Sequence, residues 1–285
     1  MGRISTTTAG CATLSSEDID VCYKLYTQYF TDRPREKFHK DFRGGQTVAR
    51  VYDEMNTVVG FSITSSQQIE CNGTTVWVVW NGDTILAKPY WSQNILGISL
   101  AKYCAALKFL HPLTPIYFFL LSEGYKSYLL LTRSFVRYYP RRSRQTPTFE
   151  SVLLRTLGEQ FGEEDFVVQR PSSPLLSECC DEQFPIILYE SGDGHVSSDW
   201  IREMNPPQST SVTTMADIEF FSYANPKFAQ GNYLCCIGAV DAPFFLNIIW
   251  SKWIKKRVLS TRNIARSILL CVLASAFCFC VFLFV

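Results

Sequence analysis

The first part of the chain carries one helical pattern followed by three extended ones. Residues 17–30 follow Ser16 as a cap and place apolar side chains at helical spacing, at positions 19, 22, 23, 26 and 30. Residues 31–45 are polar and charged, which predicts a loop. Strand patterns separated by turn residues follow at 47–52, 58–69 and 75–86, the last one broken near Asn81-Gly82-Asp83. This order predicts an antiparallel meander, with Asn72-Gly73 as one of its turns.

Strands and helices alternate in the next part of the chain. Apolar positions predict a helix over residues 95–110, which His111-Pro112 ends. Residues 116–121 are wholly apolar, as expected of a strand buried on both faces, and a helix over 125–136 follows. The first helix and its loops are long enough for a crossover between parallel strands.

Beyond residue 140 the pattern is less regular. It predicts a helix over 149–161, strands at 184–189, 218–223 and 233–240, and loop-rich stretches at 171–182 and 191–213. We divide the chain into a flexible N-terminus (1–16), a core (17–140), a C-terminal extension of the globular domain (141–245), a basic and aromatic juxtamembrane segment (246–266) and a transmembrane helix (267–285).

The transmembrane prediction rests on residues 267–285, which contain no charged residue and no proline. As a helix they would span roughly 28 Å, close to the hydrocarbon thickness of a bilayer. Six basic residues precede this run and none follows it: Lys252, Lys255, Lys256, Arg257, Arg262 and Arg266. The positive-inside rule then predicts a single-pass C-terminal anchor in a lipid bilayer, with a cytoplasmic globular domain. Trp250 and Trp253 fit an interfacial segment, although residues 244–253 could equally belong to the domain core.

Composition narrows the class of protein further. The formal net charge is +1, so nothing global indicates nucleic-acid binding. The 11 cysteines include no CxxC pair, and the three histidines, at 39, 111 and 195, are far apart, so we expect no metal site. Scattered cysteines of odd number are typical of reduced thiols in the cytosol. No GxSxG, Walker, GxGxxG or HExxH motif occurs.

Over about residues 15–140, the order of helix, meander, strand–loop–helix, strand and helix resembles the GNAT-type N-acyltransferase superfamily. The resemblance implies an α/β (mixed-sheet α+β) fold, here with a C-terminal extension and a transmembrane helix. In that family a loop with Arg or Gln, two residues, Gly, one residue and Gly or Ala holds the pyrophosphate of coenzyme A at a helix N-terminus. Two alignments to this motif are possible. If Asn94, Gly97 and Ser99 occupy its three fixed positions, small residues lie where the backbone approaches the phosphate. If Gln93 occupies the first position, Leu96 and Ile98 stand where the family has Gly and Gly or Ala.

The resemblance also implies a tyrosine that protonates the leaving thiolate. Tyr125 and Tyr128 are the candidates, since a phenol with a pKa near 10 suits a thiolate of about 8.5; packed structural tyrosines are the alternative. Lys126 would bind a phosphate or carboxylate, or face solvent. Asp83 is the candidate base because it interrupts an apolar strand beside the donor loop, and a bulge aspartate is the other interpretation. Glu70 and Glu123 come next as bases.

A basic group, Arg137, Arg141, Arg142 and Arg144, would meet a phosphate, a carrier protein, lipid headgroups or simply solvent. Together these features predict a membrane-anchored acyltransferase that moves an acyl group from acyl-CoA or an acyl-carrier thioester to an amine or hydroxyl. Its aromatic content and anchor favour a hydrophobic or carrier-bound substrate. The alternatives are a non-catalytic GNAT-like binding module on a membrane and a structural membrane protein. An open cleft would favour the enzyme, and a cleft filled by side chains such as Trp91 the module.

Overall fold

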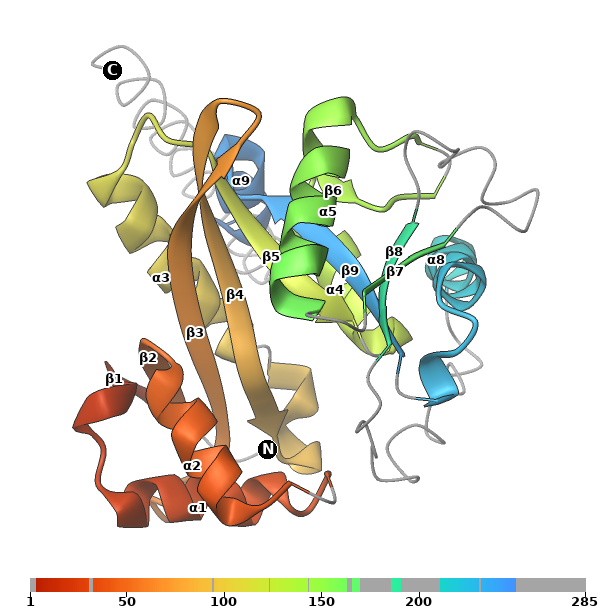
Figure 1. Cartoon of the computed structure of the whole chain (residues 1–285). Helices are drawn as coiled ribbons and strands as arrows, with labels where there is room; N and C mark the ends of the chain where they lie inside the picture. The colour runs from red at the N-terminus through yellow and green to blue at the C-terminus, as the bar shows by residue number, and fades with distance from the viewer. Residues whose placement is uncertain are drawn as a thin grey trace, which may run out of the picture.

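The computed structural model describes residues 4–30, 33–93, 95–122, 124–142, 144–162, 166–169, 186–190, 211–230 and 232–249. Their strands form one mixed sheet in the order β1-β2-β3-β4-β5-β9-β8-β7, with β6 paired to β9 (Figure 1). The strands are β1 Ser5–Gly10, β2 Thr47–Tyr52, β3 Val58–Cys71, β4 Thr74–Leu86, β5 Ile116–Ser122, β6 Tyr138–Tyr139, β7 Phe166–Gln169, β8 Ile186–Glu190 and β9 Asn232–Ala239. The helices are α1 Ser16–Tyr26, α2 Arg35–Gly44, α3 Ile95–Leu110, α4 Tyr125–Ser134, α5 Thr148–Gly162, α8 Val212–Ala224 and α9 Ala242–Ile249, with short 3-10 turns η1 Cys11–Thr13, η2 Lys88–Gln93 and η4 Phe228–Gln230.

Helices cover both faces of this sheet. Figure 1 shows α2 and α5 in front of the sheet and α3 and α9 behind it. Successive side chains of a strand point to opposite faces of the sheet. In β5, Phe118 packs with α3, α4, α8 and α9 on one face, and Phe119 packs with α5 on the other. A third apolar cluster joins α1 and α2 to one face of β3 and β4, around Phe38, Phe42 and Phe61. This two-sided burial explains why β5 is apolar at nearly every position.

The long β3–β4 hairpin turns at Asn72 and Gly73, whose φ values of 48° and 72° are those of a tight turn between antiparallel strands. β4 then pairs with β5 in parallel, and α3 provides the crossover on the back of the sheet. The meander, the crossover and the parallel pair are thus confirmed.

Three segments differ from the sequence-based expectation. Residues 31–45 contain the helix α2, whose apolar stripe consists of Phe38 and Phe42, both fully buried. Two apolar residues one turn apart are too few to mark a helix in a charged stretch. Part of the expected flexible N-terminus forms β1, antiparallel to β2. Residues 218–223, expected as a strand, belong to α8, which begins where the Ser211 hydroxyl accepts a hydrogen bond from the Thr214 amide.

The C-terminal part of the described chain packs on the domain. Phe244 of α9 is buried and stacks on Phe135 at a centroid distance of 4.6 Å, and Asn247 donates to the carbonyls of Arg133 and Ser134. Phe244 therefore belongs to the domain core, with Phe245 and Ile248 partly buried against it, which agrees with one of the two interpretations for this part of the segment, whereas Leu246 and Ile249 are exposed. Within the described ranges, none of the helices has the length and hydrophobicity needed to cross a bilayer. The predicted span, 267–285, and residues 250–266 of the juxtamembrane segment lie outside those ranges.

Candidate functional site

The candidate site is the place where β4 and β5 separate. Their parallel pairing runs from Trp77–Ile116 to Trp80–Phe119, although β4 continues to Leu86 and β5 to Ser122. Past the last pair the two strands therefore diverge as a fork. Both strands have their carboxyl ends at this edge of the sheet, which is where open α/β sheets bind ligands.

A β-bulge in β4 lies beside the fork. Ser62 is opposite Thr84 and Thr64 is opposite Asn81, so Gly82 and Asp83 together face the single residue Ile63 of β3. The predicted break in this strand is thus confirmed. Asp83 and Ile85 are two residues apart on β4, so both side chains point to the face that α1 and α2 cover.

Asp83 is held by an arginine that is distant in sequence. Nη1 of Arg33 donates to both carboxylate oxygens of Asp83, at 2.9 and 2.7 Å, and Nη2 of Arg33 donates to Asp41 at 2.7 Å. The guanidinium also lies over the rings of Tyr26 and Phe38. Burial raises the pKa of the Asp83 carboxyl, while the positive charge of Arg33 lowers it. The geometry makes Asp83 a link between β4 and α2, and its role as a base stays a prediction.

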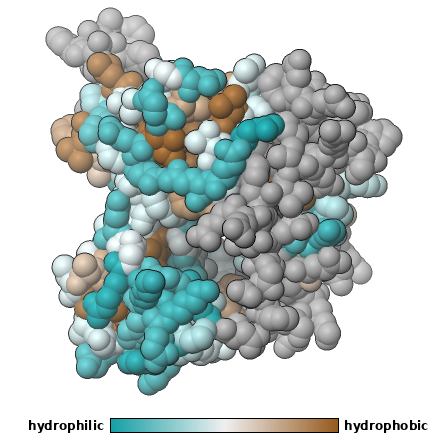
Figure 2. Space-filling model, in the orientation of Figure 1, coloured by the Kyte–Doolittle hydropathy of each residue, from teal (hydrophilic) through white to brown (hydrophobic). Residues whose placement is uncertain are grey.

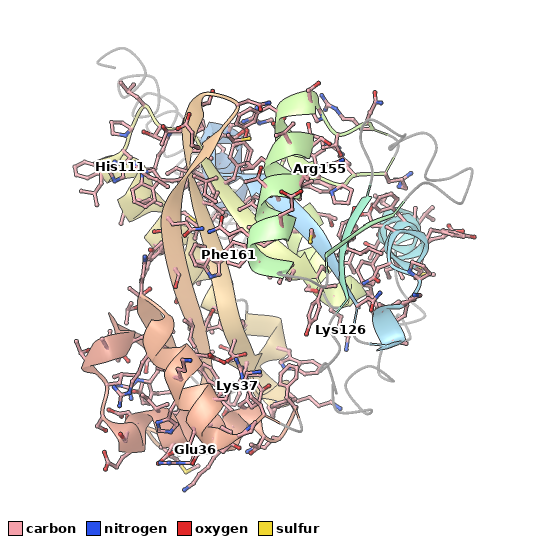
Figure 3. The ribbon with its side chains drawn as sticks, in the orientation of Figure 1. Glu36, Lys37, His111, Lys126, Arg155 and Phe161 are labelled. Carbon is pink, nitrogen blue, oxygen red and sulfur yellow. The ribbon has the colours of Figure 1, made fainter. Side chains whose placement is uncertain are left out.

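The connection from β4 to α3 crosses the mouth of the fork. In η2, the indole N–H of Trp91 donates to the carbonyl of Leu86, and Nζ of Lys126 lies 5.0 Å from the Trp91 ring centroid. Lys126 stands in the first turn of α4 (Figure 3), so this contact brings the beginnings of α3 and α4 together. Lysine over an indole is a favourable cation–π geometry.

The predicted phosphate-binding residues are placed differently from one another. Gly97 is in the first turn of α3, where backbone N–H groups have no partner within the helix. Gln93 is the last residue of η2, and Asn94 lies outside the described residues. Ser99 donates to the carbonyl of Ile95 and lines a small cavity between α3 and the β1–β3 strands, away from the helix end. Of these residues, Gly97 fits best an anion held by the α3 N-terminus.

The two candidate tyrosines have different environments. The Tyr128 hydroxyl is buried and donates to the carbonyl of Pro140 at 3.0 Å, among the rings of Phe220 and Phe221. Tyr125 is the first residue of α4, and no hydrogen bond of its hydroxyl is found within the described part of the chain. Burial raises the pKa of Tyr125, which keeps its hydroxyl protonated at neutral pH. The geometry favours Tyr125 over Tyr128 as an acid.

An aromatic cluster covers the apex of the fork on the α5 side. Phe161, near the end of α5, lies 5.0 Å from the Trp80 ring and 5.2 Å from the Phe119 ring, which are the last paired residues of β4 and β5. Figure 3 shows Phe161 in front of these strands. On the α5 side, the rings of Phe161, Trp80 and Phe119 therefore close the narrow end of the fork.

Other chemistry finds little support in the described residues. Six cysteines are described, and all are buried; burial raises the pKa of Cys104 and Cys235 to about 12, which disfavours the nucleophilic thiolate. Within the same ranges, no group of three or more His, Cys, Asp or Glu side chains could hold a metal ion. Glu70 bonds Thr75 near the hairpin turn, remote from the fork, and Glu123 lies outside the described ranges.

Arg33 is the main residue of the site that sequence reasoning missed. It stands in the stretch expected to be a loop, and nothing in its spacing from Asp83 predicts their contact. The sequence offered one signal for this residue: Arg33 is a basic residue just before α2, and α2 contains two phenylalanines one turn apart.

No protein-family model matches the chain, and no curated protein matches it. Solved structures that resemble it include a GNAT family N-acetyltransferase (YhbS) from Escherichia coli in complex with CoA, at 12% identity and a TM-score of 0.32, covering 43% of this chain and 64% of that one. Arabidopsis thaliana NAA60 in complex with acetyl-CoA has 13% identity and a TM-score of 0.35, covering 49% of this chain and 91% of that one. A GCN5-related N-acetyltransferase from Kribbella flavida has 11% identity and a TM-score of 0.38, covering 85% and 72%.

The chain thus spans somewhat less than two thirds of the length of the first of these structures. At such identities and TM-scores the likeness says nothing of the substrate. The stronger observation is the pairing itself: an antiparallel meander, a bulged fourth strand, and a parallel fifth strand that separates from it around a crossover helix. This order of elements in the described part of the chain resembles that of the GNAT-type fold.

Proposed function

We propose that the protein is an acyltransferase that moves an acyl group from a thioester donor to an amine or hydroxyl. The observation that carries this proposal is the fork between β4 and β5, with the beginnings of α3 and α4 joined at its mouth by Trp91 and Lys126. Helix N-terminal ends attract anions, and a cation stands beside them. A thioester donor that carries phosphate groups, such as acyl-CoA, suits that arrangement.

The reaction would proceed in the fork. The acceptor's nitrogen or oxygen forms a bond to the acyl carbon, and the bond from that carbon to sulfur breaks. Tyr125 gives its proton to the leaving thiolate, and the acceptor's proton passes to Asp83 or to a water that Asp83 orders. Backbone N–H groups of β4 beyond Trp80 would stabilise the oxyanion, since β5 no longer pairs with the strand there.

We also propose that residues 267–285 anchor the domain at a cytoplasmic membrane face. Large apolar side chains gather at the C-terminal end of α3 and in the loop after it: Phe109, Leu110 and Leu113 are 85%, 69% and 77% exposed. Figure 2 shows this hydrophobic surface at the upper left, and Figure 1 places α9 at the same end of the molecule. Exposed apolar side chains of this size suit a lipid surface beside the anchor, and a hydrophobic or carrier-bound substrate would be reached there.

A non-catalytic binding module is the second candidate. The contact between Trp91 and Lys126 narrows the mouth of the fork, and neither the arginine-lined cavity at the end of α4 nor the small cavity beside Ser99 lies there. Asp83, moreover, is bonded to Arg33. A protein that kept this fold only to bind a partner would show the same features.

The experiment that tests the first proposal is thermal unfolding of the full chain in a neutral detergent with acetyl-CoA, a long-chain acyl-CoA or coenzyme A. A ligand at about 100 times its dissociation constant adds roughly 2.7 kcal/mol to the free energy of unfolding. We expect a rise in melting temperature that Lys126→Gln and Gly97→Leu diminish. Lys102→Gln is the matched control, because Lys102 is an exposed lysine on the outside of α3.

Transfer to a mixture of primary amines, followed as release of the coenzyme A thiol, separates the two candidates. Acyl transfer that Tyr125→Phe abolishes supports the enzyme. Stabilisation by coenzyme A without any transfer supports the binding module. No stabilisation by any thioester near 1 mM (roughly 4 kcal/mol of binding free energy) would remove coenzyme A chemistry from consideration.

A further inference from the structure

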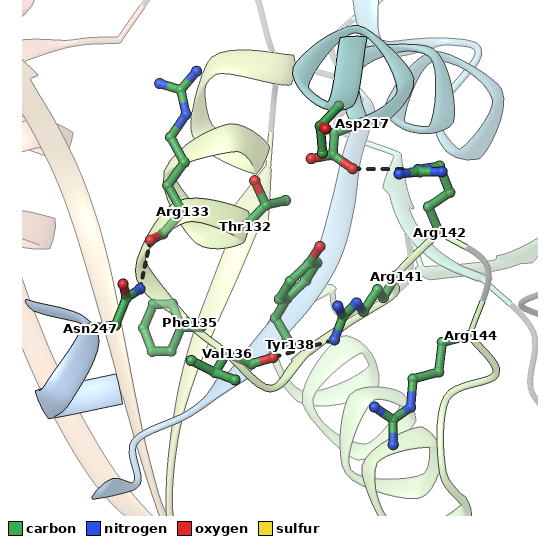
Figure 4. Close-up of a pocket in the computed structure, with 11 residues that line it drawn as sticks. Thr132, Arg133, Phe135, Val136, Tyr138, Arg141, Arg142, Arg144, Asp217 and Asn247 are labelled. Atoms are coloured by element: carbon green, nitrogen blue, oxygen red, sulfur yellow. Dashed lines mark hydrogen bonds and ion pairs between the residues drawn. The ribbon is translucent and has the colours of Figure 1, made fainter. Parts of the chain in front are cut away.

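A cavity lined by arginines lies at the opposite end of α4 from the fork. Its volume is about 650 Å³, and it is open to solvent between the last turn of α4, residues 135–144, the beginning of α8, and α9 (Figure 4). Four arginines line it: Arg133 from α4, and Arg141, Arg142 and Arg144 from the segment before α5. Arg137 is not among them, because its Nε donates to Asp241 at 2.8 Å.

Acidic side chains compensate little of this charge. Asp217 of α8 is the one carboxylate among the residues that line the cavity, and its distance to Arg142 is 3.7 Å. Arg141 donates to the carbonyl of Val136 and lies over the Tyr138 ring. No ion pair of Arg133 or Arg144 is found among the described residues. The described residues that line the cavity thus include four arginines and one carboxylate; in Figure 4 Arg142 reaches Asp217, while Arg133 and Arg144 point away from it.

The remaining groups around the cavity also suit an anion. Thr213 stands in the first turn of α8, whose N-terminal end carries a partial positive charge, and Thr132 adds a second hydroxyl. Burial raises the pKa of the Asp217 carboxyl, and the neighbouring Arg142, Arg141 and Arg133 oppose this shift only in part. Figure 4 shows Arg142 reaching towards Asp217 and Arg141 beside Tyr138. Arginine forks match the geometry of phosphate oxygens.

We propose that this cavity binds a phosphate monoester, carried either by a lipid headgroup or by a soluble molecule. Asn247 of α9 lines the cavity, and the basic residues at 252–266 and the apolar run 267–285 follow α9 in the sequence. If the chain is anchored, the phosphates of lipid headgroups would therefore be available to this cavity. The site shares no residue with the fork, so it can be tested whether or not the protein transfers acyl groups.

The test is titration calorimetry and thermal unfolding of the full chain in neutral detergent, at constant ionic strength. The probes are inorganic phosphate, dihexanoyl phosphatidic acid and dihexanoyl phosphatidylcholine. Because a hydrogen bond between charged partners is worth about 1.5–3 kcal/mol, Arg144→Gln should weaken phosphate binding roughly tenfold or more. Asp217→Asn should strengthen it, since it removes the negative charge that competes with the ligand. Lys102→Gln, which removes a positive charge from α3, should change nothing.

Opposite effects of Arg144→Gln and Asp217→Asn support the site. Tighter binding of phosphatidic acid than of inorganic phosphate identifies a lipid headgroup, and equal binding identifies a soluble phosphate ester. The proposal is overturned if neither phosphate probe binds at 10 mM (about 3 kcal/mol of binding free energy), if both variants behave as the wild type, or if phosphatidylcholine binds as tightly as phosphatidic acid. Arg133→Gln, at an exposed position, provides a second test should Arg144→Gln unfold the protein.

Discussion

At the scale of single residues, we expect one tyrosine of α4, Tyr128, to matter for stability and the other, Tyr125, to matter for acyl transfer. Tyr128→Phe removes the donor to the buried carbonyl of Pro140, so we expect a loss of about 1–2 kcal/mol in the free energy of unfolding. Tyr125→Phe removes no hydrogen bond found in the described chain and should cost less than about 0.5 kcal/mol. Acyl transfer should show the reverse order, falling about 100-fold or more in Tyr125→Phe.

Chemical denaturation and donor turnover of both variants provide the measurement. Activity lost in Tyr128→Phe but kept in Tyr125→Phe would contradict our assignment of the acid.

Asp20 gives a prediction on pH dependence. Nε and Nη2 of Arg35 and Nε2 of His39 contact its carboxylate, and the hydrogen bond from Arg35 is the main cause that lowers the pKa of Asp20 to about 2. A carboxyl whose pKa is lower in the folded than in the unfolded state stabilises the fold above the unfolded pKa, and this contribution disappears as pH falls. The melting temperature of Asp20→Asn should therefore fall less steeply than that of the wild type between about pH 4 and pH 2.

Thermal scans in that pH range check this, with Asp53→Asn as the comparison on a carboxylate of another turn. Parallel curves for the wild type and Asp20→Asn would show that the contact with Arg35 does not persist in solution.

At the scale of elements, the close approach of β9 to α4 limits one position. A Cβ atom at Gly238 would lie 2.5 Å from ring atoms of Phe135, which is itself stacked between Phe118 and Phe244. We expect Gly238→Ala to lower the free energy of unfolding by about 1–3 kcal/mol, because the ring has no free space to move into. Gly44→Ala is the matched control: nothing lies within 4 Å, and alanine favours the helix α2.

Urea denaturation of the two variants decides the matter. If Gly238→Ala were as stable as Gly44→Ala, the stacking of Phe135 on β9 would be looser than the structure has it.

Elements whose apolar residues recur at regular spacing could be predicted from the sequence, and elements without such regular spacing could not. The helix over 95–110 and the hairpin at Asn72-Gly73 follow from periodicity and turn residues, and the structure agrees with both. α8 was missed because Ile218, Phe220 and Phe221 place large apolar residues close together, as in a strand, whereas its cap, Ser211, is polar and adjoins a loop-rich stretch. In the site, a cleft was expected only from the resemblance to the GNAT-type family, and whether it was open or filled was left undecided. The pair of Asp83 and Arg33 depends on tertiary packing, which local sequence does not encode.

At the scale of the whole molecule, α4 connects two places that the fold keeps apart. Its first residues, Tyr125 and Lys126, belong to the fork, and its last turn, with Arg133, belongs to the arginine-lined cavity. α9 is fixed to that last turn by Asn247. If both proposed ligands bind, phosphate in the cavity should change the affinity for the thioester and the thioester should change the affinity for phosphate by the same factor, because coupling between binding sites is reciprocal.

Calorimetric titration of each ligand with and without the other measures that factor. A shared factor different from one would show that the sites are coupled, as expected if α4 links them, and a factor of one would show that they act independently.

The place of β5 in the sheet has a consequence for synthesis of the chain. One of its neighbours, β4, precedes it, but Phe118 lies opposite Gly238 in β9, which a ribosome makes much later. Until then β5 would present an apolar, unpaired edge, the kind of surface that aggregates. We expect a chain truncated after residue 230 to be insoluble on expression, and a chain truncated after residue 249 to remain dispersed in detergent. Folding of this protein would thus wait for its last strand, and during that interval it would depend on chaperones.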